Sequence, residues 1–178
     1  PKSLLRHKRC VSRLDEFGPG TTFHRVLWDD AQLTGGLQPD KNIRRVVLCA
    51  GKVYFDLLEE RERRGIDDIY LMRVEQLYPF PRKALIEELG RFIKADVVWC
   101  QEESENMGAW TFIDRRLENL MVELKMPALR PRYVGRPGSA APATGLMKRH
   151  LKEQKALVDE ALTLPAKPKT RKASRKTK

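Results

Sequence analysis

Short apolar segments that alternate with segments of helical periodicity are the feature that most constrains the fold of this chain. Three such segments span Ile43 to Ala50, Ile69 to Val74 and Asp96 to Cys100, and each is long enough for one buried β-strand. A helix-length stretch separates each segment from the next. This alternation predicts right-handed crossovers and a mainly parallel sheet with helices on both faces. The predicted fold class is therefore three-layer α/β/α.

Glycine and proline residues mark where the intervening helices begin and end. Val53 to Arg64 carries apolar residues at helical spacing and stops at Gly65, a residue type favoured at helix C-termini. Pro79 and Pro81 prevent regular structure until a second helix can begin. The periodicity predicts further helices at residues 82–93, 110–124 and 144–162, and a short strand at residues 131–134.

The two ends of the chain differ in composition from the segment between them. Because the chain starts at Pro1 instead of Met, we expect residues 1–42 to be a leader from a preceding domain. Within this leader, Thr21 to Leu27 is the candidate edge strand, and Asp29 to Lys41 is a predicted surface loop. Residues 43–162 form the predicted α/β domain. Residues 163–178 hold seven of the eleven net positive charges and few apolar side chains, which predicts a disordered basic tail.

Cysteine and hydropathy patterns indicate a protein of a reducing aqueous compartment. Cys10, Cys49 and Cys100 are far apart and form no C-x-x-C pair, which argues against a disulfide framework or a zinc site. Cys49 and Cys100 lie inside apolar segments and are predicted core residues. No apolar stretch approaches the roughly 18 residues that cross a bilayer. We therefore expect a cytoplasmic protein without a membrane partner.

No motif of a self-contained catalytic, cofactor or metal site is present. The chain lacks G-x-x-x-x-G-K-[ST], G-x-G-x-x-G, H-E-x-x-H and the Gly-Asp-Gly that introduces a magnesium-diphosphate site. His7, His24 and His150 fall in unrelated segments, so each is interpreted as a structural or solvated residue. The sequence thus predicts no catalytic, cofactor-binding or metal-ligating residue in this chain.

Polar residues follow the third predicted strand and form one half of a candidate interface. Glu102 and Glu103 come directly after the strand that ends at Cys100, and Asn106 and Trp110 belong to the same connection. Two adjacent carboxylates at a strand end could form a site of perturbed acidity, and ordinary helix-capping or solvated carboxylates are the alternative. Trp110 is the predicted packing anchor of this connection.

A loop of small residues, Gly135 to Thr144, forms the other half of the candidate interface. Its glycines and alanines allow close approach of another backbone, which favours a protein interface, although an ordinary surface connection is the alternative. Because the carboxyl ends of parallel strands meet at one edge of a sheet, the two loops are predicted to lie close together. Arg136 would then pair with Glu102 or Glu103, locally or across the interface.

The net charge of +11 raises nucleic acid as a possible partner, since clustered Lys and Arg bind phosphate chains. Most of this charge lies in the tail, however, and 7% aromatic residues provide no evident stacking surface. A nucleic-acid function is therefore disfavoured. Two functions remain: a domain that uses the two loops as a protein interface for assembly, and a stand-alone α/β regulatory or nucleotide-binding module that uses the strand-end loops.

Four segments of the chain form a distinctive series. They are Pro-Lys-Ser-Leu-Leu-Arg-His at 1–7, Val-Val-Leu-Cys-Ala-Gly-Lys-Val-Tyr at 46–54, Arg-Val-Glu-Gln-Leu-Tyr-Pro-Phe-Pro at 73–81 and Gln-Glu-Glu-Ser-Glu-Asn-Met-Gly-Ala-Trp at 101–110. In this order they resemble the C-terminal, transketolase-like domain of bacterial 2-oxoglutarate dehydrogenase decarboxylase subunits. The likeness covers residues 1–162, and Ser104 stands where many members carry proline, a departure that does not affect the fold.

The resemblance implies a thiamin-diphosphate enzyme of the tricarboxylic acid cycle that decarboxylates 2-oxoglutarate and passes the succinyl group to a lipoyl arm of dihydrolipoyl succinyltransferase. It implies that preceding domains bind thiamin diphosphate and magnesium, so that the isolated chain is inactive. It also implies a five-stranded, mostly parallel sheet with one antiparallel edge strand, and a homodimer. Ser3 and Arg6 lie at what resembles the junction with the preceding domain, where some members bind acetyl-CoA; a solvated linker is the alternative.

Overall fold

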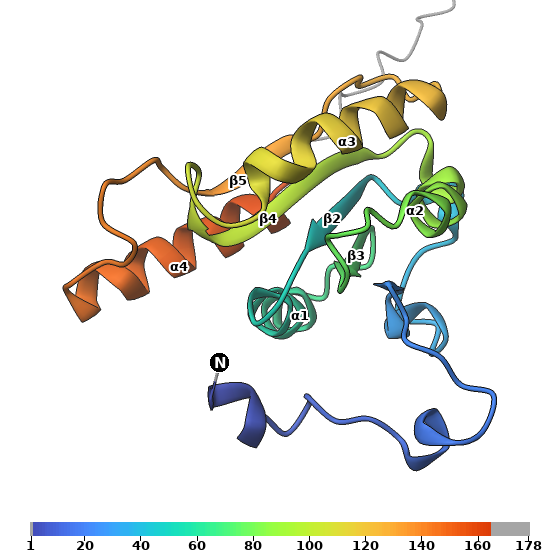
Figure 1. Cartoon of the computed structure of the whole chain (residues 1–178), viewed down its shortest axis with the longest axis horizontal. Coiled ribbons are helices and arrows are strands. Elements are labelled where there is room, and N and C mark those ends of the chain that lie inside the picture. The colour runs from blue at the N-terminus through green and yellow to red at the C-terminus, as the bar shows by residue number, and fades with distance from the viewer. Residues whose placement is uncertain (1, 165–178) are drawn as a thin grey trace, which may run out of the picture.

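The computed structural model describes residues 2–164, which form one five-stranded mixed sheet flanked by helices (Figure 1). β1 pairs antiparallel with β3, and the other neighbouring strands are parallel. The predicted five-stranded, mostly parallel sheet with one antiparallel edge strand is confirmed. The strands, in the spatial order β1-β3-β2-β4-β5, are β1 (Val26–Leu27), β2 (Arg45–Cys49), β3 (Ile69–Val74), β4 (Asp96–Ser104) and β5 (Arg132–Arg136).

Helices cover both faces of this sheet and complete the predicted three-layer α/β/α architecture (Figure 1). The helices α1 (Val53–Arg64) and α4 (Met147–Leu162) pack on one face. The helices α2 (Arg82–Leu89) and α3 (Trp110–Glu123) pack on the other. None of the helices within residues 2–164 combines the length and the apolar character needed to cross a bilayer.

Strand β2 occupies the centre of the sheet and is buried along its whole length, as its apolar sequence predicts. Its successive side chains alternate between the two cores: Val46 and Leu48 contact the α2–α3 layer, and Val47 and Cys49 contact the α1–α4 layer. Burial raises the pKa of the Cys49 thiol well above its usual value and that of Cys100 to about 12. Both predicted core cysteines are therefore inert thiols.

The observed boundaries match the prediction where local signals are strong. Helix α1 spans Val53–Arg64 as predicted, and Gly65 ends it in the left-handed conformation at φ 62°. Helix α2 is shorter than predicted because a 3-10 turn, Gly90–Phe92, follows it. Helix α4 begins at Met147 instead of Thr144. Strand β4 continues four residues beyond Cys100, because its backbone pairs with β5 as far as Ser104 opposite Arg136.

The segment before β2 has little regular structure. The predicted edge strand is present, but it is shorter than expected because only Val26 and Leu27 pair with β3. The basic tail predicted from the sequence lies outside the described residues, apart from Thr163 and Leu164. Short 3-10 turns occupy other parts of the segment, at Lys2–Arg6, Leu14–Phe17, Asp30–Gln32 and Asp40–Asn42.

Asp29 corrects the prediction that residues 29–41 form a surface loop. Its side chain is fully buried and accepts hydrogen bonds from both terminal nitrogens of Arg61, one of them at 2.9 Å. The Leu71 backbone amide donates to the same carboxylate at 2.8 Å, and the Asp29 amide donates to the Tyr70 hydroxyl at 3.0 Å. Arg61, a residue of α1, also donates to the Ile69 carbonyl at 3.1 Å. This buried pair joins the N-terminal segment, α1 and β3.

We expect replacement of Asp29 by alanine to lower the free energy of unfolding by about 3–5 kcal/mol, because Arg61 would keep its charge without a buried partner. Urea denaturation of the isolated chain measures this loss. The neighbouring Asp30 is exposed, so Asp30→Ala is the matched control and should change stability by less than about 0.5 kcal/mol. Equal losses in the two variants would contradict the assignment of Asp29 as a structural anchor.

Candidate functional site at the carboxyl edge of the sheet

The side chain of Gln101 organises the connection between β4 and α3. Gln101 is 3% exposed, and its Oε1 accepts hydrogen bonds from Trp99 Nε1 and from the Trp110 backbone amide, both at 3.0 Å. Its Nε2 donates to the carbonyl oxygens of Met107 at 2.8 Å and Ser104 at 3.1 Å. One buried amide therefore satisfies polar groups on both sides of the connection and fixes its shape.

The two loops of the candidate interface lie side by side, as predicted. Asn106 Nδ2 donates to the Ser139 carbonyl at 2.9 Å, and Asn106 Oδ1 accepts from the Ser139 amide at 2.9 Å. The Glu105 amide donates to the Arg136 carbonyl at 3.0 Å, which extends the contact toward β5. These bonds join the connection after β4 to the loop after β5 into one surface.

Tyr133 contacts residues in both parts of this surface. Its hydroxyl donates to the Arg136 carbonyl at 2.8 Å, and its ring centroid lies 5.3 Å from that of Trp110. Burial raises the pKa of the Tyr133 phenol to about 12, so the hydroxyl remains a donor. Gly135 is required here, because a Cβ atom would lie 2.9 Å from the Gln101 carbonyl oxygen and closer still to the Tyr133 hydroxyl.

Arg136 is buried and binds α4 and the loop that precedes it. Its Nη1 donates to Glu153 Oε2 and Thr144 Oγ1, each at 3.3 Å, and its Nη2 donates to Gln154 Oε1 at 3.0 Å. Nη2 also lies 3.0 Å from His150 Nδ1, which must accept because a guanidinium only donates. The predicted structural role of His150 agrees with this contact.

The predicted pairing of Arg136 with Glu102 or Glu103 is wrong within the chain. Both acids belong to the extended strand β4 instead of a loop, and the Arg136 guanidinium forms its side-chain contacts with Thr144, His150, Glu153 and Gln154. Glu102 Oε2 instead lies 3.3 Å from Lys52 Nζ and 3.3 Å from Gln154 Nε2. Glu103 is exposed and makes its hydrogen bonds through its carbonyl oxygen.

Several charged side chains at this edge form ion pairs with one another. Burial alone would lower the pKa of Lys52, but its hydrogen bond to Asp56 and the nearby carboxylates raise that pKa overall. The hydrogen bond from the Thr144 hydroxyl lowers the pKa of Glu153, and Arg149 lowers it further. Lys52, Glu102 and Glu153 are therefore engaged in contacts within the chain.

A cavity of about 250 Å³ lies between the loop at residues 137–146 and α4. Among residues 2–164, no three His, Cys, Asp or Glu side chains come together in a way that could hold a metal ion. The lining of the cavity combines short polar side chains with paired charges, including Ser139, Thr144, Arg149 and Glu153.

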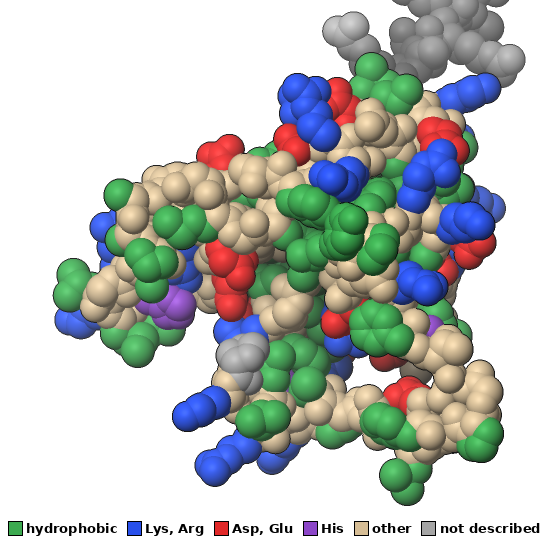
Figure 2. All heavy atoms as spheres, viewed as in Figure 1, with side chains coloured by type: hydrophobic (Ala, Val, Ile, Leu, Met, Phe, Trp, Pro, Cys, Tyr) green, Lys and Arg blue, Asp and Glu red, His purple; other side chains and the backbone are tan. Residues whose placement is uncertain are grey.

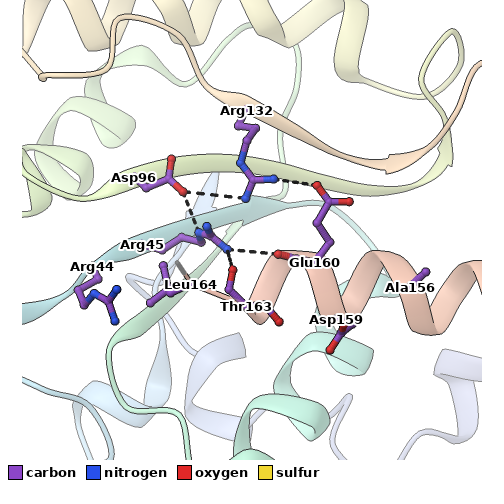
Figure 3. A pocket seen from close by; sticks show the side chains of 9 residues that line it. All are labelled: Arg44, Arg45, Asp96, Arg132, Ala156, Asp159, Glu160, Thr163 and Leu164. Atoms are coloured by element: carbon purple, nitrogen blue, oxygen red, sulfur yellow. Dashed lines mark hydrogen bonds and ion pairs between the residues drawn. The ribbon is translucent and has the colours of Figure 1, made fainter. Parts of the chain in front are cut away.

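A larger cavity of about 780 Å³ lies at the opposite, amino edge of the sheet (Figure 3). Figure 3 shows Arg45 pointing to the end of α4, where its Nη1 donates to the carbonyl oxygens of Ala161 at 2.8 Å and Thr163 at 2.9 Å. Its Nε donates to Asp96 at 2.9 Å. Arg45 therefore caps a helix C-terminus, and ligands of open α/β sheets bind at the other edge.

Ser3 and Arg6, the predicted effector junction, lie apart from the carboxyl-edge network. Both side chains are exposed on the first 3-10 turn, and no hydrogen bond or ion pair in the described part of the chain joins either to the two loops. The turn lies against α1, because the ring centroid of the following His7 is 4.7 Å from that of Phe55.

Comparison with known proteins decides the family. Residues 11–162 match the family model described as 2-oxoglutarate dehydrogenase C-terminal. The chain belongs to this family. It is 61% identical over 166 residues to the 2-oxoglutarate dehydrogenase E1 component of Brucella anthropi, and 60% identical over 166 residues to those of Brucella ovis and Brucella canis. The resemblance stated from the sequence is confirmed.

The chain covers only part of these 2-oxoglutarate dehydrogenase relatives. Each alignment includes 91% of this chain but only 16–17% of the relative. The carboxyl-edge surface is therefore a feature of the C-terminal region of much longer proteins.

Sequence reasoning missed several residues that build this region of the 2-oxoglutarate dehydrogenase C-terminal domain. Tyr133 belongs to no motif, and Gln101 stands in the family segment at 101–110 without a signal of its buried role; both roles depend on neighbours that the fold supplies. The one available signal was Gly135, since an isolated glycine at the end of a predicted strand indicates a close approach of another group.

We expect Gln101→Ala to cost about 3 kcal/mol or more of the free energy of unfolding, because it leaves the buried Trp99 indole N–H and several backbone groups without partners. Hydrogen exchange should accelerate at residues 104–110 in the same variant. Gln38 makes its side-chain hydrogen bond at an exposed position, so Gln38→Ala is the control and should cost less than about 1 kcal/mol. Unchanged exchange at residues 104–110 would count against the proposed organising role of Gln101.

Proposed function

We propose that this chain is the assembly domain of a 2-oxoglutarate dehydrogenase and that its carboxyl-edge surface meets the preceding domains and a second subunit. The observation that supports this role is the pair of loops held together by Asn106 and Ser139. Residues 137–143 are exposed on this rigid surface and are mostly small, so another backbone can approach closely. A preorganised surface binds a partner without the entropic cost of ordering its loops.

The complete protein, on this proposal, decarboxylates 2-oxoglutarate and transfers the succinyl group to a lipoyl arm of dihydrolipoyl succinyltransferase. Thiamin diphosphate and magnesium do not fit the described residues of this chain, because the carboxyl-edge acids Glu102 and Glu153 are engaged by Lys52 and by arginines. We therefore assign both cofactors to preceding domains and derive no chemical step here. On the same proposal, the complete protein is a cytoplasmic homodimer that acts in the tricarboxylic acid cycle.

An effector role is proposed for the first 3-10 turn. Ser3 and Arg6 present an exposed hydroxyl and guanidinium beside α1, a combination suited to the phosphates of acetyl-CoA at a domain junction. No glycine-rich phosphate loop accompanies them, so a stand-alone nucleotide-binding module is not favoured by any feature of the chain.

The assembly role predicts that the complete polypeptide dimerises less tightly when the surface is altered. Ala140→Arg places a long charged side chain on the exposed loop and leaves the Arg136 network intact, so the dimer dissociation constant should rise about 100-fold. Sedimentation velocity over a dilution series measures this change. Arg115→Ala, at an exposed position of α3, is the control. Unchanged dimer stability together with unchanged 2-oxoglutarate decarboxylation would refute the assembly role.

We also expect the isolated chain to be catalytically inert. Purified residues 1–178 should neither bind thiamin diphosphate with micromolar affinity nor decarboxylate 2-oxoglutarate, because the sequence carries no Gly-Asp-Gly motif and the described residues bring together no group that could hold magnesium. Titration calorimetry with thiamin diphosphate and magnesium measures the binding. Tight binding to this chain alone would overturn the assignment of the cofactors to other domains.

A further inference from the structure

Residues 11–23, which we call the apolar loop, are attached to the domain at both ends, and no hydrogen bond within residues 2–164 joins them to it between these ends. Before the loop, the Arg9 guanidinium donates to both carboxylate oxygens of Glu62 on α1, at 2.6 and 2.7 Å. After the loop, the Arg25 carbonyl accepts from the Glu75 amide at 2.9 Å. The loop is therefore held at a fixed place beside α1 and β3.

The apolar loop maintains its own shape. The Arg13 guanidinium pairs with Asp15 at 2.8 Å, the Arg13 amide donates to the Glu16 carboxylate at 3.1 Å, and the Glu16 amide donates to the Arg13 carbonyl at 3.1 Å. Further along, the Thr21 hydroxyl donates to the Gly18 carbonyl at 2.8 Å. All side-chain hydrogen bonds formed by residues 11–23 stay within the loop, so its conformation does not depend on burial against the domain.

The 3-10 turn at Leu14–Phe17 presents two large apolar side chains to solvent. Side chains three residues apart eclipse in a 3-10 helix, so Leu14 and Phe17 lie on the same side of the turn. Leu14 is 92% exposed and Phe17 is 75% exposed, and Val11 and Phe23 are also exposed. Figure 2 shows hydrophobic side chains on the lobe that the N-terminal segment forms at the bottom of the view, away from the body of the domain.

A preformed turn that exposes two eclipsed apolar side chains has the form of a docking element, because apolar area of this kind is favourably removed from water. The exposed fractions of Leu14 and Phe17 show that the described part of the domain does not cover them. The family is the C-terminal part of 2-oxoglutarate dehydrogenases, and this chain spans 16–17% of its relatives, so most of their length precedes it.

We propose that Leu14 and Phe17 dock into an apolar depression on the polypeptide that precedes residue 1 in the full-length protein. This inference rests on the family and on the greater length of the relatives, and it does not depend on the proposed decarboxylation of 2-oxoglutarate. It adds a second attachment, distinct from the carboxyl-edge loops, between this domain and the rest of the protein. Arg13, which is exposed in this chain, directly precedes Leu14, so protease cleavage after Arg13 reports whether the loop is docked.

Trypsin cleavage after Arg13 tests the proposal, since the Arg13 side chain is 81% exposed in this chain alone. In the full-length protein the cleavage should be at least about tenfold slower than in residues 1–178, because the docked loop is closed to protease. The double variant Leu14→Ser, Phe17→Ser should restore fast cleavage in the full-length protein. Leu129→Ser, a substitution at another exposed apolar position, is the control and should leave the slow rate unchanged.

The results of this experiment distinguish between the possible partners of the apolar loop. Equal cleavage rates in wild-type full-length protein and in residues 1–178 would overturn the proposal, and this comparison needs no variant. Protection that appears in residues 1–178 as their concentration rises would assign the loop to a second copy of this chain and would also overturn it. Because proteolysis requires no catalytic activity, failure here is distinguishable from failure of the proposed function.

Discussion

Burial of the parallel sheet on both faces is the constraint on which the rest of this structure depends. Strand β2 has no exposed residue, so the polar groups that specify partners must lie at the two edges of the sheet or in the segments that enter and leave it. Polar side chains that are buried next to the sheet need hydrogen-bond partners inside the protein. Asp29 and Arg61 are such partners for each other, and Gln101 forms hydrogen bonds with the connection after β4.

The two edges of the sheet use arginine in different ways. At the amino edge, Arg45 binds the carbonyl oxygens at the end of α4 and holds that helix to β2. At the carboxyl edge, Arg136 binds side chains in the first half of α4 and the Thr144 hydroxyl in the loop before it. Strands of the sheet thus hold α4 both in its first half and at its C-terminal end. The loop at residues 137–146 consequently has a defined position, which a surface for assembly requires.

The N-terminal segment combines firm attachment with exposure. Arg9 and the short strand β1 fix its ends, whereas the apolar side chains between them face solvent. This arrangement differs from the carboxyl edge, where hydrogen bonds join the two loops and the exposed residues 137–143 are mostly small. The domain therefore carries two chemically different surfaces, one apolar and one polar.

Local signals in the sequence determined the order of strands and helices, the positions of α1 and β3, and the burial of Cys49 and Cys100. Apolar periodicity and Gly65 act over a few residues, so no tertiary contact was needed to interpret them. The sequence also placed the two loops at one edge, because parallel strands end on the same side. Tertiary structure alone decided that Asp29 and Arg61 are buried together, that β4 continues to Ser104, and that Arg136 binds Glu153 instead of Glu102. These outcomes depend on which groups meet across different elements, and a buried charge is stable only beside the partner that the complete fold supplies.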